Sequence, residues 1–397
     1  MFSWTQTDSQ GRRKVSGKEL LWQAALVLAV TSIIGSAVWN AADNLARQRI
    51  ASGFGFLQQT AGFDISQSLI SFDALSTYGR AFVVGLLNTL EVSLIAIPLA
   101  TILGFTIGIF RRSPNWLLSR LAAAYVEIFR NTPLLLQLLF WYNAVLMLLP
   151  AKASESLQLG DLLYLNRRGL SVPKPLVGDN TLLCGGIIAL SVLLVVLTIH
   201  WARTRRYRTG RSLPTISLSL LILVCVPAVL GMLVTLTSGQ ALLHLELPRP
   251  GRFSVEGGWQ LLPEFVALLI GLVVYTASSI AEVVRSGLAA VPRGQYEAAR
   301  ALHLPSVKIL RLVVVPQAIR VIIPPLTNQY LNLLKNSSLA VAIGYPDLVQ
   351  VFAGTVLNQT GQAVEIVLMT MAVYLTLSLL TSAGMNVYNR RVALVER

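Results

Sequence analysis

This 397-residue sequence is short of charged residues, which make up only 13% of it. Soluble domains carry roughly a quarter charged residues, and disordered chains, collagens and coiled coils need more charge, glycine or proline. Hydrophobic residues make up 54% of the chain, and its mean hydropathy is +0.64. These values exclude a soluble two-domain enzyme and predict an all-α membrane protein that crosses the bilayer many times.

Cysteine, histidine and acidic residues are also scarce. The two cysteines, Cys184 and Cys225, lie in apolar stretches without C-x-x-C spacing, so neither a disulfide framework nor a metal site is expected. No H-E-x-x-H or comparable motif occurs, which disfavours a membrane-embedded enzyme. The formal charge is +14, but its basic residues flank long apolar runs. We therefore interpret them as topological anchors and expect no nucleic-acid binding.

Apolar runs long enough to cross ~30 Å of hydrocarbon recur along the chain, and we expect about eight transmembrane helices. They lie at about Leu20–Trp39, Phe82–Phe110, Leu117–Leu149, Leu182–Trp201, Leu213–Leu236, Leu262–Leu288, Val321–Tyr345 and Ala363–Tyr388. The first run is long and lacks a clear small-residue cleavage site, which favours an uncleaved anchor over a signal peptide. Placing the N-terminus in the cytoplasm puts most of the 32 Lys and Arg residues in cytoplasmic segments, so we expect both termini there.

The loop at 289–320 is the most informative segment of the sequence. Good helix formers predict a short helix from Gln295 to Leu302, which Leu304-Pro305 ends because proline disfavours α geometry in the preceding residue. A second amphipathic stretch, Ser306 to Val314, leads to the next span. A basic helix–turn–helix of this kind docks a soluble partner, lies on anionic lipid, or is an interfacial helix without either role.

This loop resembles the EAA loop of bacterial ABC importer membrane subunits, whose pattern is E-A-A, three residues, G, nine residues, I-x-L-P. Glu297-Ala298-Ala299 begins the pattern, Val313 takes the isoleucine position, and Val315-Pro316 replaces Leu-Pro. His303 stands where the family has glycine. Glycine permits a tight turn there, and histidine tolerates positive φ better than most residues.

Further blocks resemble the polar amino acid permeases, and the length resembles the Q-type subunit of general L-amino acid importers. The blocks are NTLEVSLIAIPLATILGF, YVEIFRNTPLLLQLLFWY, YTASSIAEVVRSGLAAVPRGQ and NQYLNLLKNSSLA. The resemblance implies a five-helix permease core in the bacterial inner membrane. It also implies three kinds of partner: a homologous permease subunit, two cytoplasmic ATPase subunits and a periplasmic amino acid-binding protein, with membrane lipid around them.

The family's EAA loop forms the coupling helix that sits in a groove of the ATPase. The resemblance therefore implies that ATP and Mg bind to the ATPase subunits and that this chain binds no cofactor. No G-x-x-x-x-G-K-[ST] phosphate loop occurs in the sequence. The alternative is a secondary transporter or channel that is driven by an ion gradient.

The resemblance and the span positions together divide the chain into four parts. Residues 1–79 hold the N-terminal tail, the first span and a periplasmic loop, whose Gly-, Ser- and Phe-rich composition predicts an ordered, irregular cap. Residues 80–149 begin the permease core, 150–261 are an insertion with two extra spans, and 262–397 complete the core.

Three groups of residues are candidates for function. The ATPase-coupling group is Glu297, Ala298, Ala299, Arg300, His303 and Pro316. The substrate-pathway group is Asn336 and Ser337, with Ser278, Ser279, Asn328 and Gln329 as weaker members; the alternative is that these polar residues hold helices together. The gate group is two acid–base pairs at i, i+3, Glu127 with Arg130 and Glu282 with Arg285, each of which alternatively only neutralises itself at a helix end.

Overall fold

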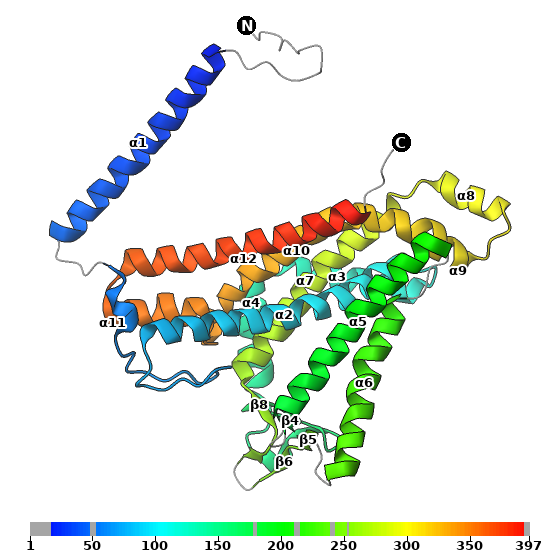
Figure 1. The fold of residues 1–397 in the computed structure, drawn as a ribbon, viewed down its shortest axis with the longest axis horizontal. Coiled ribbons are helices and arrows are strands. Elements are labelled where there is room, and N and C mark those ends of the chain that lie inside the picture. Colours follow the sequence, from blue (N-terminus) through cyan, green and yellow to red (C-terminus); the bar gives the residue numbers. More distant parts are fainter. Residues whose placement is uncertain are drawn as a thin grey trace. The chain divides into compact units, whose positions relative to one another are not determined.

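The computed structural model describes residues 17–47, 53–177, 181–209, 215–238, 243–251 and 254–392 (Figure 1). The expected span start at Leu213 and both chain termini lie outside these residues. The chain forms two compact units. The first holds Met1–Leu90 and Pro346–Gly384, and the second holds Glu91–Tyr345 and Met385–Arg397.

Seven of the described helices are long and apolar enough to cross a membrane. Their spans are Leu20–Ala37, Tyr78–Phe110, Leu183–Ala202, Ser217–Thr237, Pro263–Ala289, Ser306–Ile343 and Ala363–Asn389. They match seven of the eight expected spans and confirm a helical membrane protein.

The remaining expected span, Leu117–Leu149, is not one continuous helix. Helix α3 (Trp116–Asn131) is followed by Thr132, whose φ of −97° and ψ of 127° are extended and lie outside the helical region. Helix α4 (Leu134–Leu139) begins after Pro133. The prediction of a single long helix was wrong because the proline ring disfavours α geometry in the residue before it.

Buried Gln137 closes this break. Its Nε2 donates hydrogen bonds to the carbonyl oxygens of Phe129 at 2.9 Å and Thr132 at 3.0 Å. The last carbonyls of a helix have no partner within it, and at membrane depth they need one from the protein. The chain then continues from α4 into the π-helix η2 (Phe140–Leu146), so the two halves form one broken apolar segment.

The insertion contains the two expected helices, α5 (Thr181–Thr209) and α6 (Thr215–Ser238), which pack against each other. It also contains short strands that the sequence analysis did not predict. One antiparallel sheet has the order β1-β2-β3-β8, and two further antiparallel pairs are β4-β5 and β6-β7. The bounds are η3 (Ala153–Glu155), β1 (Leu157–Leu159), β2 (Leu163–Asn166), β3 (Gly169–Val172), β4 (Lys174–Val177), β5 (Leu243–Glu246), β6 (Arg249–Pro250), β7 (Val255–Glu256) and β8 (Trp259–Leu261).

Strand pairing joins the two ends of this insertion. In the β3–β8 pair, Leu170 lies opposite Leu261, and in the β4–β5 pair, Lys174 lies opposite Glu246. Strands of two to four residues leave little periodicity in a sequence, and their partners here lie about 70 to 90 residues away. The segment before α5 is thereby tied to the segment after α6.

The first unit is built around an aromatic core. Its elements are α1 (Gly17–Arg47), the 3₁₀-helix η1 (Phe54–Gln58), the first part of α2 (Tyr78–Phe110), the π-helix η6 (Val349–Val356), α11 (Leu357–Thr360) and most of α12 (Ala363–Val392). Phe56, Tyr78 and Phe352 are buried together, and Phe82 meets Phe352 edge-on at 5.0 Å. The described residues 53–77 form η1 and one bridge, Thr60 to Thr77, which confirms an ordered, irregular segment there.

The second unit is centred on α7 (Pro263–Ala289), which packs against α3, α4 and α10 (Val315–Asn336). The second half of α2 approaches α7 at two glycines. A Cβ at Gly104 would lie 2.6 Å from Cβ of Ile280, and one at Gly108 would lie 2.7 Å from Cβ of Val284. Because no side chain fits at these distances, the G-x-x-x-G spacing lets the two backbones come together, as in other membrane helix pairs.

Beyond α7 the chain turns through a helix–turn–helix that we call the elbow, residues 293–314. It consists of α8 (Arg293–Ala301), α9 (Ser306–Ile309) and the π-helix η4 (Leu310–Val314), followed by α10 and the 3₁₀-helix η5 (Ser337–Ile343). Both expected helices of this loop are confirmed. The following span begins earlier than the expected Val321, because Pro316 lies in the first turn of α10, where proline is tolerated.

Candidate functional site

The turn of the elbow is fixed by three backbone hydrogen bonds at the end of α8. The N–H of Leu302 bonds to Ala298, that of His303 to Arg300 at 2.8 Å, and that of Leu304 to Ala299 at 3.3 Å. The last two form a Schellman motif, in which the residue after the C-cap adopts a left-handed conformation. His303 has that conformation, with φ of +53°, and is the only non-glycine residue with positive φ among those described. The structure thus confirms that histidine makes the turn at the family's glycine position.

The two faces of α8 differ in exposure. Ala299 is buried and Tyr296 half-buried, and both join the main core of the second unit. Glu297, Ala298 and Arg300 are exposed on the other side. The EAA alanines therefore have different environments: Ala299 packs inward and Ala298 faces outward.

Apolar and charged side chains share the outer surface of the elbow. Leu302 is 74% exposed and Val307 is 76% exposed, one on each side of His303. Glu297 and Arg300 form no salt bridge within the part of the chain that the structure describes, although their i, i+3 spacing permits one. The outer surface of the elbow therefore combines accessible apolar side chains with charges that no described residue pairs.

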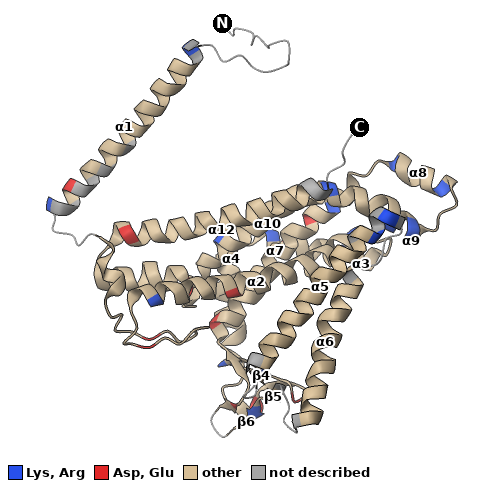
Figure 2. Ribbon diagram, in the orientation of Figure 1, with Lys and Arg blue, Asp and Glu red and all other residues tan. Residues whose placement is uncertain are grey.

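Basic side chains gather around this elbow, as Figure 2 shows for α8 and α9. The exposed ones are Arg293, Arg300, Lys308 and Arg311. Glu297 is the single acidic residue between 293 and 314. The elbow therefore presents positive charge interrupted by one carboxylate.

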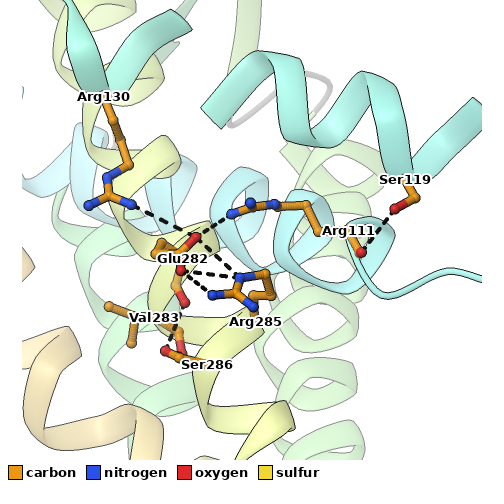
Figure 3. A network of polar contacts seen from close by, with 7 residues as sticks. All are labelled: Arg111, Ser119, Arg130, Glu282, Val283, Arg285 and Ser286. Carbon is orange, nitrogen blue, oxygen red and sulfur yellow. Dashed lines mark hydrogen bonds and ion pairs between the residues drawn. The ribbon is translucent and has the colours of Figure 1, made fainter. Parts of the chain in front are cut away.

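A second cluster of charge, which we call the arginine cluster, surrounds Glu282 on α7 (Figure 3). Arg285, one turn further along α7, donates from Nε to Glu282 Oε1 at 3.1 Å. Arg111, at the end of α2, donates to Oε2, and Nη1 of Arg130 on α3 lies 3.8 Å from the same oxygen. One carboxylate thus joins three helices and is outnumbered by three guanidinium groups.

The sequence analysis paired Glu282 with Arg285, and the structure places these two together. It does not place Glu127 with Arg130. The Glu127 side chain is exposed and forms no ion pair with any described residue, whereas Arg130 reaches Glu282. Arg111 was missed, and the signal for it was the Gly104 and Gly108 spacing that brings the end of α2 against α7.

The polar stretch after α10 marks a change of helix type. Asn336 is the last residue of α10, and η5 begins at Ser337. The Ser337 hydroxyl is buried and donates to the carbonyl oxygen of Leu334 at 2.7 Å. Asn336 is half-buried, and its side chain has no hydrogen-bond partner within the described ranges. Of these two candidates, only Asn336 offers polar atoms that the chain itself does not use.

The weaker substrate-pathway candidates lie in different environments. Ser278 is fully buried, and its hydroxyl bonds to the carbonyl oxygen of Tyr275 at 2.6 Å. Ser279 and Gln329 are half-buried, and Asn328 is exposed. Ser278 thus supports its own helix, and the other three keep side chains that are at least partly accessible.

Sequence reasoning also missed a buried carboxyl in the first unit, Asp347. Its Oδ1 accepts from the N–H of Gln350 at 2.8 Å, and Tyr374 OH lies 3.4 Å from Oδ2. Burial raises the pKa of this carboxyl to about 7. On α2, Asn88 and Thr89 bond to the adjacent backbone at Pro346 and Leu348. Asp347 therefore lies at a polar junction just before η6 (Val349–Val356), which its isolated position in the sequence does not indicate.

No group of three or more His, Cys, Asp or Glu side chains within the described ranges could hold a metal ion. The chemistry that the two charge clusters permit is ion pairing and docking.

The family model of binding-protein-dependent transport system inner membrane components matches residues 96–394 of the chain. YhdX of Escherichia coli (strain K12) is 48% identical over 95% of this chain and 94% of YhdX. The general L-amino acid transport system permease protein AapQ of Rhizobium johnstonii is 49% identical over 94% of this chain and 92% of AapQ. Among solved structures, that of an amino acid ABC transporter with histidines matches with a TM-score of 0.47 and 21% identity, over 79% of this chain and 95% of that chain.

Proposed function

Because the chain belongs to the family of binding-protein-dependent transport system inner membrane components, we propose that it is the membrane-spanning permease subunit of an ABC importer for L-amino acids. The observation that carries this proposal is the extent of similarity to AapQ, a general L-amino acid permease. That similarity covers 94% of the chain, so it includes the insertion as well as the core.

The proposed partners follow from this division of labour. Two ATPase subunits in the cytoplasm supply ATP hydrolysis and bind ATP and Mg, since this sequence has no phosphate-binding loop. A homologous permease subunit completes the pathway, and a periplasmic binding protein delivers the amino acid. Both termini then lie in the cytoplasm, which the excess of Lys and Arg in the loops on that side supports.

The elbow is the proposed contact with the ATPase. Two features support this: the unpaired Glu297 and Arg300, and the exposed Leu302 beside them. A partner can shift a conformational equilibrium only through contacts that differ between the two states. Because the chain is helical from Ser306 to Ile343, movement of the elbow is passed directly to the span that follows. ATP-driven closure of the ATPases then drives alternating access.

We propose that the arginine cluster closes the inner mouth of the pathway. It lies at the same end of α7 as the elbow, and its one carboxylate ties α7 to α3 and to the end of α2. Moving any of these helices apart breaks an ion pair, so the cluster gives the closed state contacts that the open state lacks. Glu127, being exposed, acts outside this cluster.

The experiment that tests the function is uptake of labelled L-amino acids by proteoliposomes that contain the assembled transporter. We expect uptake that requires ATP inside, together with the binding protein outside, and that persists when an ionophore removes ion gradients. Uptake that needs an ion gradient and no ATP would instead establish the secondary-transporter alternative.

In the same assay, Asn336→Ala tests the proposed substrate pathway. Loss of an amide that hydrogen-bonds the amino acid is expected to raise KM about tenfold, because such a bond to a charged group contributes about 1.5 kcal/mol. Ser338→Ala is the matched control, since the Ser338 hydroxyl bonds to the backbone carbonyl of Lys335. Unchanged KM in Asn336→Ala would return the polar stretch to a role in holding helices together.

A further inference from the structure

A cavity of about 520 Å³ lies in the second unit beside the elbow. Its walls come from the end of α2, the start of α3, the end of α7, and the elbow with α10. Side chains that form them include Phe105, Ile109, Leu118, Val284 and Ile319. Tyr296 of α8 and Leu310 of η4 also line it, so the elbow forms part of the wall.

The walls are almost entirely apolar, and the polar groups stand together at one place. Besides Tyr296, the lining residues with polar side chains are Arg112 and Ser113, which lie in the turn between α2 and α3. The Arg112 side chain is exposed and forms no salt bridge with the residues that the structure describes. Within the described residues, the site thus combines an apolar chamber with one lining arginine that forms no salt bridge.

Size restricts what such a chamber accepts. Its volume lies within the range of small-molecule sites, about 300–1,000 Å³. A helix with its side chains is about 10–12 Å across and does not enter a chamber of this volume. A hydrocarbon chain does, and two of the lining residues on α2, Ile109 and Phe110, are 50% and 40% exposed.

Charge restricts the occupant further. Arg112 directly follows Arg111 of the arginine cluster, which already has three guanidinium groups for one carboxylate. This surplus of positive charge stands at the end of the spans that we propose faces the cytoplasm, where anionic lipids supply the complementary charge. Basic pockets between membrane helices on that side are typical sites for lipid headgroups.

We propose that this cavity binds an anionic phospholipid of the cytoplasmic leaflet, with one acyl chain inside it and the phosphate at Arg112. The acyl chain lies against Val284 and Leu288 of α7, Tyr296 of α8 and Ile319 of α10, and so fills the space between the elbow and the spans. The acyl chain exchanges contacts with other lipids for contacts with the cavity walls, so the hydrophobic effect contributes little to this binding, and the arginine selects the headgroup.

The binding test uses the assembled transporter in nanodiscs that contain phosphatidylglycerol with a photoactivatable group on one acyl chain. Crosslinked peptides, mapped by mass spectrometry, are expected from the end of α2 and from η4 and the start of α10. A phosphatidylcholine probe with the same acyl chain is expected to label these peptides about fivefold less, since one arginine near the surface contributes about 1 kcal/mol. This binding rests on the proposed cytoplasmic orientation of this end of α7 and not on the transport function itself.

Two variants and two matched controls complete the test. Val315→Trp fills the chamber and is expected to abolish labelling, whereas Leu312→Trp, on the exposed surface of η4, is expected to leave it unchanged. Arg112→Gln is expected to remove the preference for phosphatidylglycerol, whereas exposed Arg120→Gln, which does not line the cavity, is expected to retain it. Equal labelling by both lipids in the unmodified transporter, labelling that survives Val315→Trp, or no labelling of these peptides would each overturn the proposal.

Discussion

Two glutamates, fifteen residues apart and each followed by an arginine three residues later, have opposite surroundings in this molecule. Glu282-Val-Val-Arg285 lies in α7, where the acid pairs with its own arginine and with Arg111 and Arg130. Glu297-Ala-Ala-Arg300 lies in α8, where both charges are exposed and no described residue pairs with them. The same spacing therefore gives an ion pair in α7 and two charges without a described partner in α8. We call Glu282 with Arg285 the closed pair and Glu297 with Arg300 the open pair.

The difference shows that the surroundings, and not the spacing, decide the role of such a pair. More than half of the apolar stretch of α7 is buried, and an unpaired charge in such a helix is costly. The elbow is exposed, so an ion pair on its surface would contribute little to stability until another surface excluded water from it. We therefore propose that Glu297 and Arg300 meet a partner, whereas Glu282 and Arg285 hold α7 to its neighbouring helices within the chain.

The largest expected effect comes from forcing α2 away from α7, because their close approach brings Arg111 to Glu282. Gly108→Leu places a side chain where even a Cβ would lie 2.8 Å from the carbonyl oxygen of Ala281. We expect the free energy of unfolding to fall by about 3 kcal/mol, the upper end for overpacked sites, measured as the thermal midpoint of the purified transporter in detergent.

The control for this variant is Gly231→Leu in α6, where no atom lies within 4 Å of an added Cβ. It exchanges glycine for a better helix former and is expected not to destabilise the protein. Equal losses of stability in the two variants would show that the close approach of α2 to α7 is not what positions Arg111.

The next effect contrasts the two glutamates directly. Glu282→Gln leaves three guanidinium groups without their carboxylate and is expected to cost about 2 kcal/mol, less than a fully buried pair because the cluster is partly exposed. Glu297→Gln is expected to leave the thermal midpoint unchanged and to lower ATP-driven uptake. If both variants lost stability to the same extent, the distinction between a closed and an open pair would be lost.

Within the arginine cluster, exposure ranks the partners. The Arg111 side chain is 16% exposed and that of Arg130 is 46% exposed. Substitution of Arg111 by glutamine is therefore expected to cost more stability than the same change at Arg130, measured beside Glu282→Gln. The reverse order would indicate that Arg130, and not Arg111, holds the carboxylate.

Asp347 extends the comparison of the glutamates, because it is a buried carboxyl that hydrogen-bonds within the chain and has no ion pair with a described residue. Its pKa is raised to about 7 in the folded protein, so the folded state binds its proton more tightly than the unfolded state does. The stability that this proton contributes is complete below about pH 4 and is lost as the pH rises through about 7. Asp347→Asn is therefore expected to be more stable than the unmodified protein at pH 8, on the order of 1–3 kcal/mol, and equal to it at low pH.

The measurement for Asp347 is the thermal midpoint as a function of pH. Asp64→Asn, an exposed position in the same unit, is the control and is expected to follow the unmodified protein at every pH. Parallel curves for Asp347→Asn and the unmodified protein would show that Asp347 stays ionised in the fold.

The sequence predicted the parts of the fold that rest on local signals. Apolar length predicted seven spans, and the alanines with Leu304-Pro305 predicted the helices of the elbow. The histidine in the glycine position was compatible with positive φ, as observed. In each case the signal lies within the segment that forms the element.

What sequence missed depends on contacts between distant segments. The β3–β8 pairing joins residues about 90 apart, and Arg111 reaches Glu282 only because two glycines let α2 approach α7. Pro133 was visible, but its break is tolerated because Gln137 satisfies the freed carbonyls. That Glu282 and not Glu297 pairs within the chain follows from these contacts and not from the residues of either E-x-x-R segment.

The central claim is that the outer face of the elbow is held by an ATPase subunit. A photocrosslinking residue at Ala298, which faces outward, is expected to capture the ATPase in intact cells, whereas the same residue at buried Ala299 is expected not to. Absence of an ATPase adduct at Ala298, in cells where the transporter is assembled and active, would contradict the account.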